Sequence, residues 1–138
     1  MKVFIITAFA GLLLFSCNKT NSPGKGMVTG KWELRQSTGG IAGTINYAPG
    51  NGMAIVFDNS NQYQYIYPVA DSVSPRSGTY EIKGSAHSGD WLLQLQYVVD
   101  NQAYTEKDSI RFEANKLIFI STAPYVDMPT FSYERLSY

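Results

Sequence analysis

Two carboxylates, Glu106 and Asp108, stand two residues apart in a stretch where polar and apolar side chains alternate. Residues at this spacing on a β-strand point to the same face, and this face also carries Tyr104, Ile110 and Phe112. A carboxylate pair facing inward would hold protons more tightly and could act as acid and base or bind a cation. We expect instead that the stretch lies near a rim or carries a bulge, which leaves both carboxylates in water.

The other groups that could do chemistry are single. His87 is the only histidine and lies in the turn-like segment 83–89, and Cys17 is the only cysteine. A nucleophile needs a base beside it, and a zinc site needs several nitrogen or sulfur ligands. The chain cannot assemble either set. We therefore expect no enzyme, no catalytic residues, no metal site and no cofactor.

Cys17 follows a short apolar segment at the N-terminus. Lys2 precedes a hydrophobic run of 13 residues, Val3 to Phe15, and Ser16 stands before the cysteine. As a helix this run would be about 20 Å long, against a hydrocarbon core of about 30 Å, which is typical of a signal peptide. The segment resembles the lipobox of bacterial lipoprotein precursors. The resemblance implies that residues 1–16 are a signal peptide and that Cys17 carries fatty acyl chains such as palmitate.

A conventional signal peptide with an incidental cysteine is the alternative to this interpretation. Residues 17–28 are predicted to be the lipidated cysteine and a flexible tether, because 18–28 are polar and rich in Pro and Gly. In Bacteroidetes lipoproteins, which the precursor resembles, acidic residues after the cysteine signal surface export. None lies between Asn18 and Gly26. We therefore expect a lipid-anchored protein of the cell envelope, on the outer membrane and facing the periplasm.

The remaining residues, 29–138, have the length of one domain. The 138-residue chain contains 11 basic and 11 acidic residues, and its lysines and arginines form no cluster. This composition offers no electrostatic footprint for nucleic acid. Because one cysteine cannot form a disulfide within the chain, the fold must depend on its hydrophobic core.

The apolar residues of this domain recur with a period of two, which is typical of half-buried β-strands. The clearest run is Trp91 to Val99, with apolar side chains at odd positions. Similar patterns predict seven more strands, near 29–37, 53–57, 63–67, 78–82, 103–113, 115–121 and 130–137. Turn signals separate them, and no helical period is evident beyond the signal peptide. We expect an all-β fold, an eight-stranded antiparallel up-and-down barrel, because closure removes exposed edges. A β-sandwich is the alternative.

Several short motifs resemble those of lipocalins and lipocalin-like proteins. Gly30-Lys31-Trp32 resembles the Gly-x-Trp at the start of their first strand, and Arg135 lies where their last strand often carries a basic residue. The resemblance implies that Gly30, Trp32 and Arg135 close one end of the barrel, with the guanidinium stacked on the indole. Motifs in the same order as in small lipocalin-like lipoproteins of Bacteroidetes continue at Ile55–Phe57, Tyr63, Gly78–Ile82, Leu117–Phe119 and Tyr133–Leu136. A helix after the last strands and a disulfide, both found in true lipocalins, are missing from the sequence.

Three tyrosines, Tyr63, Tyr65 and Tyr67, share one face of a predicted strand. Facing inward, they would form an aromatic wall with polar tips, suited to a ring-bearing or amphipathic ligand. Facing outward, they would form a stripe for a protein or a sugar. A third interpretation is aromatic packing in a filled barrel, since an eight-stranded interior is either filled or wide enough for one small ligand.

The 16 residues from Ser37 to Gly52 are rich in glycine and predict a long loop. Loops of this length are usually functional or disordered. The resemblance implies a lid over the barrel mouth, with Ile41, Ile45 and Tyr47 above an apolar cavity; a floppy connector is the alternative. The candidate ligand-binding residues are therefore Ile41, Ile45, Tyr47, Phe57, Tyr63, Tyr65, Tyr67, Tyr80 and Tyr97.

These inferences predict a membrane-anchored, non-enzymatic binding module that takes a small apolar or amphipathic ligand in the barrel mouth. Its expected partners are the membrane, through the N-terminal lipid, and possibly that ligand, with no nucleic acid. The alternative is an envelope lipoprotein with a filled barrel that binds another protein or a glycan through its outer surface.

Overall fold

The computed structural model describes residues 25–68, 76–84, 91–122 and 129–137. The predicted signal peptide, Cys17, most of the predicted tether and His87 lie outside these ranges. One short helix and nine strands are present in the described part: α1 (Lys25–Val28), β1 (Gly30–Thr38), β2 (Thr44–Asn46), β3 (Ala54–Phe57), β4 (Gln62–Ile66), β5 (Ser77–Lys83), β6 (Trp91–Val99), β7 (Gln102–Glu113), β8 (Lys116–Ser121) and β9 (Thr130–Arg135). Within those ranges no helix is both long and apolar enough to cross a membrane.

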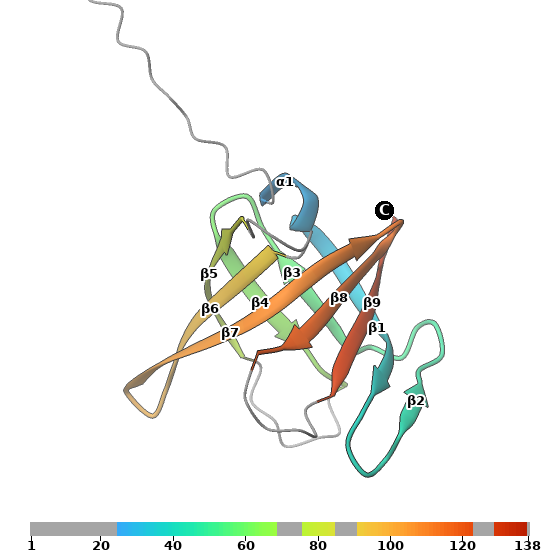
Figure 1. Cartoon of the computed structure of the whole chain (residues 1–138). Coiled ribbons are helices and arrows are strands. Elements are labelled where there is room, and N and C mark those ends of the chain that lie inside the picture. The colour runs from blue at the N-terminus through green and yellow to red at the C-terminus, as the bar shows by residue number, and fades with distance from the viewer. Residues whose placement is uncertain (1–24, 69–75, 85–90, 123–128, 138) are drawn as a thin grey trace, which may run out of the picture.

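Eight of the strands form a closed antiparallel barrel (Figure 1). From β3 to β9 each strand pairs with the next, β1 pairs with β3, and β1 pairs with β9 to close the ring. The closing pair joins Trp32 to Arg135 and Thr38 to Thr130, with one register shift between Leu34 and Gln36. The predicted up-and-down barrel is confirmed, and the hydrogen-bonded contact between first and last strands excludes the sandwich.

The ninth strand, β2, was not expected from the sequence. It pairs with Gln36 to Thr38 of β1 and extends the sheet beside the barrel rather than across its mouth (Figure 1). The chain that follows packs on the outer face of β1, where Asn51 donates from Nδ2 to the Leu34 carbonyl at 2.8 Å. The Gly50 amide likewise donates to buried Glu33 at 3.0 Å. Because backbone and side-chain bonds hold this segment outside, the lid expected over residues 37–52 is absent.

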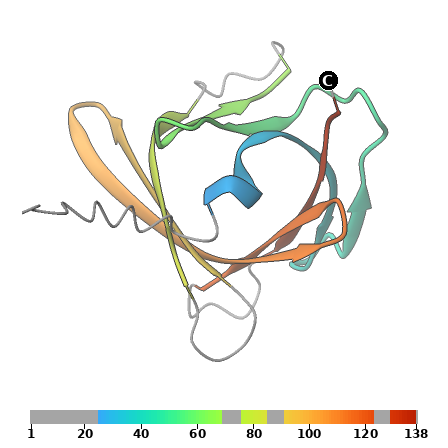
Figure 2. The ribbon, with the colours of Figure 1, turned by 90° about the horizontal axis from the view of Figure 1, so that it is seen from above.

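The last turn of the expected tether belongs to the folded domain. Lys25 to Val28 form α1, the Thr29 hydroxyl donates to the Lys25 carbonyl at 2.9 Å, and Val28 is fully buried. Seen along the barrel, α1 lies over the middle of one end (Figure 2). A buried valine stabilises the folded state by about 1.5 to 3 kcal/mol, so this turn is a plug rather than a flexible spacer.

The end of the barrel beneath α1, which we call the closed end, is sealed by Trp32 and Arg135. The Trp32 indole donates from Nε1 to the Val28 carbonyl at 2.6 Å, and the Arg135 guanidinium lies 4.6 Å from the indole centroid. Arg135 also donates to the carbonyls of Met27 at 2.5 Å and Thr29 at 3.2 Å. Gly30 has φ +133°, a conformation that L side chains rarely adopt, at the point where the chain enters β1.

Aromatic and aliphatic side chains fill the half of the barrel next to the closed end. Phe57 and Tyr80 pack edge to face at 4.9 Å, and Trp32 packs against Phe112 at 6.3 Å. Alternate positions of the strands supply the fully buried side chains Ile55, Phe57, Leu93, Leu95, Ile110 and Leu117. The inward positions in this half therefore carry apolar side chains. Inward positions near the other end include the polar Asp108 and Ser121.

Candidate functional site

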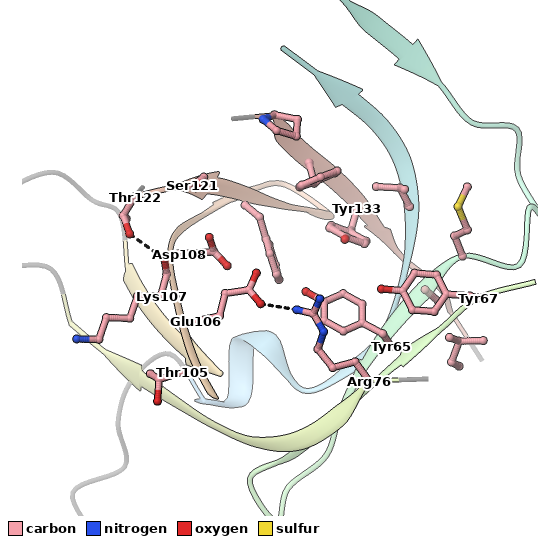
Figure 3. Close-up of a pocket in the computed structure, with 17 residues that line it drawn as sticks. Tyr65, Tyr67, Arg76, Thr105, Glu106, Lys107, Asp108, Ser121, Thr122 and Tyr133 are labelled. Carbon is pink, nitrogen blue, oxygen red and sulfur yellow. Dashed lines mark hydrogen bonds and ion pairs between the residues drawn. The ribbon is translucent and has the colours of Figure 1, made fainter. Parts of the chain in front are cut away.

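A cavity of about 700 Å³ opens at the end of the barrel opposite α1, which we call the open end. Its walls come from strands β1, β3, β4, β7, β8 and β9 and from the residues that flank them (Figure 3). The lining is Leu34, Met53, Ala54, Tyr65, Ile66, Tyr67, Arg76, Thr105, Glu106, Lys107, Asp108, Phe119, Ser121, Thr122, Pro129, Phe131 and Tyr133. Phe, Tyr, Leu, Met and Ile side chains dominate it, with a few charged groups.

The hollow follows from the residues at the inward positions of the strands. Asp108 on β7 and Ser121 on β8 face each other at inward positions, where other inward positions of the barrel carry larger apolar side chains such as Leu93 and Leu117. A serine is too small to reach across the barrel, and a carboxylate is poorly accommodated by a packed apolar interior. The interior is therefore filled near the closed end and left hollow near the open end.

Asp108 points into this cavity and is 8% exposed. The expectation that Glu106 and Asp108 stay in water at a rim or bulge is therefore wrong for Asp108. Strand β7 pairs with β6 without interruption from Gln102 to Ile110, so alternation places Asp108 on the same inward face as buried Ile110. Burial, reinforced by the neighbouring Glu106 and opposed by Arg76, raises the pKa of the Asp108 carboxyl from 3.8 to about 6.

Glu106, two residues earlier on the same face, forms an ion pair with Arg76. The Arg76 Nη1 donates to Glu106 Oε2 at 2.5 Å, and each side chain is 36% exposed. The guanidinium also lies 4.6 Å from the ring centroid of Tyr97 and 5.6 Å from that of Tyr65. A pair this exposed adds little stability, but the two rings and the carboxylate together fix where the guanidinium sits.

Phenols form much of the wall facing the two carboxylates. Tyr65 packs edge to face on Tyr63 at 5.8 Å and stacks on Tyr67 at 6.0 Å, and Tyr133 faces the same space from β9 (Figure 3). Burial is the main cause that raises the pKa of Tyr65, Tyr67 and Tyr133 above the ordinary value. These phenols are therefore neutral hydrogen-bond donors and acceptors at physiological pH.

Tyr63 lies just behind this wall and is 2% exposed. Its hydroxyl makes no hydrogen bond in the part of the chain that the structure describes. Burial, with Arg76 acting in the opposite direction, raises the pKa of Tyr63 to about 12. A buried hydroxyl without a partner costs about 1 to 3 kcal/mol, and such groups are uncommon outside functional sites.

The structure brings some of the predicted ligand-binding residues together and not others. Tyr65 and Tyr67 line the cavity, Tyr63 lies behind them, and Tyr97 lies under Arg76. Phe57 and Tyr80 belong to the core near the closed end, where the Tyr80 hydroxyl donates to the Asp58 carbonyl at 2.7 Å. Ile41 and Ile45 are exposed, and Tyr47 is half-buried beside Ser37, so these three do not form the cavity wall.

The sequence interpretation missed the polar side of the cavity. Arg76, Tyr133 and the apolar Phe119 and Phe131 were not proposed as site residues, and Asp108 was placed in water. The sequence did contain a signal that Asp108 faces inward, because it lies two residues from the apolar Ile110 and therefore on the same face of the strand. Arg76 had no such signal, since it precedes β5 and reaches the site only through the folded barrel.

The described residues contain no group of three or more His, Cys, Asp or Glu side chains able to hold a metal ion. Among the described residues, the acidic side chains that line the cavity are Glu106 and Asp108. The arrangement can bury an apolar body against aromatic rings and offer a carboxylate, an ion pair and several phenols to polar groups at its end. Comparisons with protein-family models, with curated proteins and with solved structures found no match.

Proposed function

We propose that the protein is a membrane-anchored, non-enzymatic binding module that takes one small apolar or amphipathic ligand into the open end of the barrel. The observation that carries the proposal is the cavity of about 700 Å³ with mainly apolar walls and a few convergent polar groups. Small-molecule sites in proteins have this size and this composition. The mouths of β-barrels are among the places where such sites occur.

The unpartnered polar groups at the open end support binding more than a purely structural role. Proteins rarely bury a carboxylate or a phenol without a hydrogen-bond partner, because desolvation of each group costs free energy. The Tyr63 hydroxyl has no partner among the described residues, and burial is the largest cause of the raised pKa of the Asp108 carboxyl. A ligand with a polar group that pairs with Asp108, which lines the cavity, recovers the part of this cost that falls on the carboxyl.

The sequence supports the anchoring part of the proposal. The segment from Lys2 to Cys17 has the basic, apolar and small-residue order of a lipoprotein signal peptide, and the protein resembles the lipocalin-like lipoproteins of Bacteroidetes. We place the mature protein on the outer membrane, facing the periplasm. Cells fed a radioactive fatty acid should label the protein, and Cys17→Ala should lose the label. Label that survives this substitution contradicts acylation at Cys17.

Binding of the neutral, environment-sensitive dye Nile red tests the cavity. The purified domain should enhance the dye's fluorescence, and Ser121→Phe, which places a ring in the cavity wall, should reduce the enhancement at least about fivefold because the added ring occupies the space of the ligand. Ala103→Phe is the matched control, since Ala103 is exposed on β7 and lies outside the cavity. No enhancement by the wild type, or equal loss in both variants, would overturn the proposal.

A second candidate function is docking of another envelope protein or a glycan on the outer surface. The β6–β7 hairpin favours it, because Val98 is 66% exposed, Val99 is 46% exposed, and Tyr104 stacks on Tyr97 at 5.5 Å. The hairpin projects from the barrel wall (Figure 1). Val98→Asp should then abolish partner binding and leave Nile red binding unchanged, whereas Ser121→Phe should do the reverse.

A further inference from the structure

We propose that the ligand carries a cationic ammonium group on an apolar body, and that this group pairs with Asp108 in the cavity. The inference rests on the proposed function and narrows it to one chemical class. Three features of the open end support it: the pairing of its charges, the aromatic surface beside Asp108, and the poor fit of an anion.

The first feature concerns the two basic residues that line the cavity: one is paired with a carboxylate, and the side chain of the other points away from the cavity centre. The Arg76 guanidinium is held by Glu106 at 2.5 Å. Lys107 follows Glu106 on β7, and its side chain points away from the cavity centre, as expected from strand alternation (Figure 3). Arg76 lowers the proton affinity of Asp108 less than burial and Glu106 raise it. Inside the cavity one carboxylate therefore remains without a matching cation among the described residues.

An unmatched buried carboxylate has a definite preference among ligands. Its desolvation is unfavourable, and a cation within about 4 Å recovers free energy that no neutral group can supply in this low-dielectric setting. Asp108 is 8% exposed, and the influences on its carboxyl are burial and the charges of Glu106 and Arg76, with no hydrogen bond among them. An ammonium group that enters with the ligand completes the pair, as Arg76 does for Glu106.

The second feature is aromatic. Tyr65, Tyr67 and Tyr133 stand around the space in front of Asp108, and Phe119 and Phe131 line the same cavity (Figure 3). The faces of aromatic rings attract cations, and this attraction strengthens when the cation is desolvated. The phenol oxygens also accept hydrogen bonds from N–H donors. Rings that would hold any apolar body thus hold an ammonium-bearing one more firmly.

The third feature is that an anionic ligand fits the cavity poorly. A carboxylate or phosphate would lie near Asp108 and Glu106 and would have to take Arg76 from Glu106. Breaking that pair leaves Glu106 uncompensated next to Asp108, and like charges at close range are unfavourable. The charge arrangement therefore discriminates against the anions that a barrel of this kind could otherwise accept.

Three probes with one ring system and different charge test the inference: 1-naphthylmethylammonium, 1-naphthylmethanol and 1-naphthoate. Titration calorimetry of the purified domain at pH 7.5 should give the order ammonium, alcohol, carboxylate, from tightest to weakest. We expect the ammonium to bind about tenfold or more tighter than the alcohol, which corresponds to about 1.4 kcal/mol. An alcohol or carboxylate that binds as tightly as the ammonium overturns the inference.

Asp108→Asn isolates the charge in the same experiment. It keeps the size of the side chain and removes the negative charge, so the ammonium should lose its advantage and bind within about twofold of the alcohol. Asp100→Asn is the matched control, because Asp100 is exposed in the β6–β7 turn at φ +50°, which asparagine tolerates. Equal selectivity in wild type and Asp108→Asn would assign the preference to another group and overturn the inference.

The same titrations separate this inference from the proposed function. Binding of the alcohol without preference for the ammonium leaves the cavity as a site for apolar ligands and removes only the cation selectivity. Failure of all three probes, together with absent Nile red binding, removes the binding function itself.

Discussion

Each end of the barrel has an arginine stacked on an aromatic ring, but the two arginines have different surroundings. At the closed end Arg135 lies 4.6 Å over the ring of Trp32, and at the open end Arg76 lies 4.6 Å over the ring of Tyr97. Arg135 also donates to backbone carbonyls, and Val28 fills the space beneath α1. Arg76 donates to a carboxylate and borders a cavity. An arginine stacked on a ring therefore does not by itself distinguish a seal from a binding site; what occupies the lumen beside it does.

The ends also differ in how well their polar groups are satisfied. The indole nitrogen of Trp32 and the hydroxyl of Tyr80, both buried near the closed end, donate to backbone carbonyls. Toward the open end, the hydroxyl of Tyr63 has no such partner among the described residues, and the Asp108 carboxyl is buried beside the like charge of Glu106. Unsatisfied groups lower stability, and proteins retain them where function requires them. We therefore expect substitutions at the closed end to lower stability, and one at the open end to raise it.

The largest expected effect is at the closed end. Trp32→Ala removes a nearly fully buried ring together with its hydrogen bond to Val28, and it should lower the free energy of unfolding by roughly 3 to 5 kcal/mol. Urea denaturation measures the loss. In conditions where the variant is folded, the ratio of ammonium to alcohol affinity should match that of wild type. If Trp32→Ala lowers the free energy of unfolding by less than about 1 kcal/mol, the closed end does not have the stabilising role that distinguishes it here from the open end.

Asp108→Asn should change stability in the opposite direction. The folded pKa of about 6 lies above the ordinary 3.8, so the wild type loses stability as pH rises through this window, and the penalty is complete above it. The shift corresponds to about 3 kcal/mol at most. Two charged groups also act on this carboxyl: Glu106 raises the pKa of Asp108, and Arg76 lowers it.

Denaturation at a series of pH values measures the effect of this variant. The difference between Asp108→Asn and wild type should be near zero at pH 4 and should grow to its full value by pH 7, in favour of the variant. A variant less stable than wild type at pH 7 would show that Asp108 has a stabilising partner.

The two arginines provide the smallest and most closely matched comparison. Arg135→Ala removes the stack on Trp32 and two bonds to backbone carbonyls, and should lower stability by about 1 to 2 kcal/mol. Arg76→Ala removes a similar stack but a half-exposed ion pair, and should cost about 0.5 kcal/mol. Thermal unfolding of both variants in one buffer compares them. Equal losses would mean that both arginines seal the barrel alike.

Much of the fold could be predicted from the sequence. The alternation of apolar residues gives eight strands close to their observed bounds, because side-chain alternation is a local property of the strand. Strand β2 was missed, since Thr44 to Asn46 are all exposed and three residues are too few to establish a period of two. The turn α1 was missed because four residues are too few for a helical period, and Val28 is buried only by packing on the barrel end.

The site was less predictable, because it depends on where the inward positions of different strands meet. Tyr65 and Tyr67 could be proposed from one strand alone. The hollow depends on Asp108 of β7 and Ser121 of β8 lying opposite each other, and this register is a tertiary property. The error for Asp108 has a physical basis, since buried carboxylates without partners are uncommon and exposure was the better expectation from sequence alone.

One measurement tests the division between the two ends most directly. Amide and indole NMR signals of the labelled domain can be followed during titration with 1-naphthylmethanol. We predict shifts for residues of the open end, such as Tyr67, Asp108 and Phe131, and unchanged signals for the Trp32 indole N–H and Arg135 at the closed end. Shifts confined to the β6–β7 hairpin or to the closed end, or no shifts at saturating probe, would contradict the assignment of ligand binding to the open end.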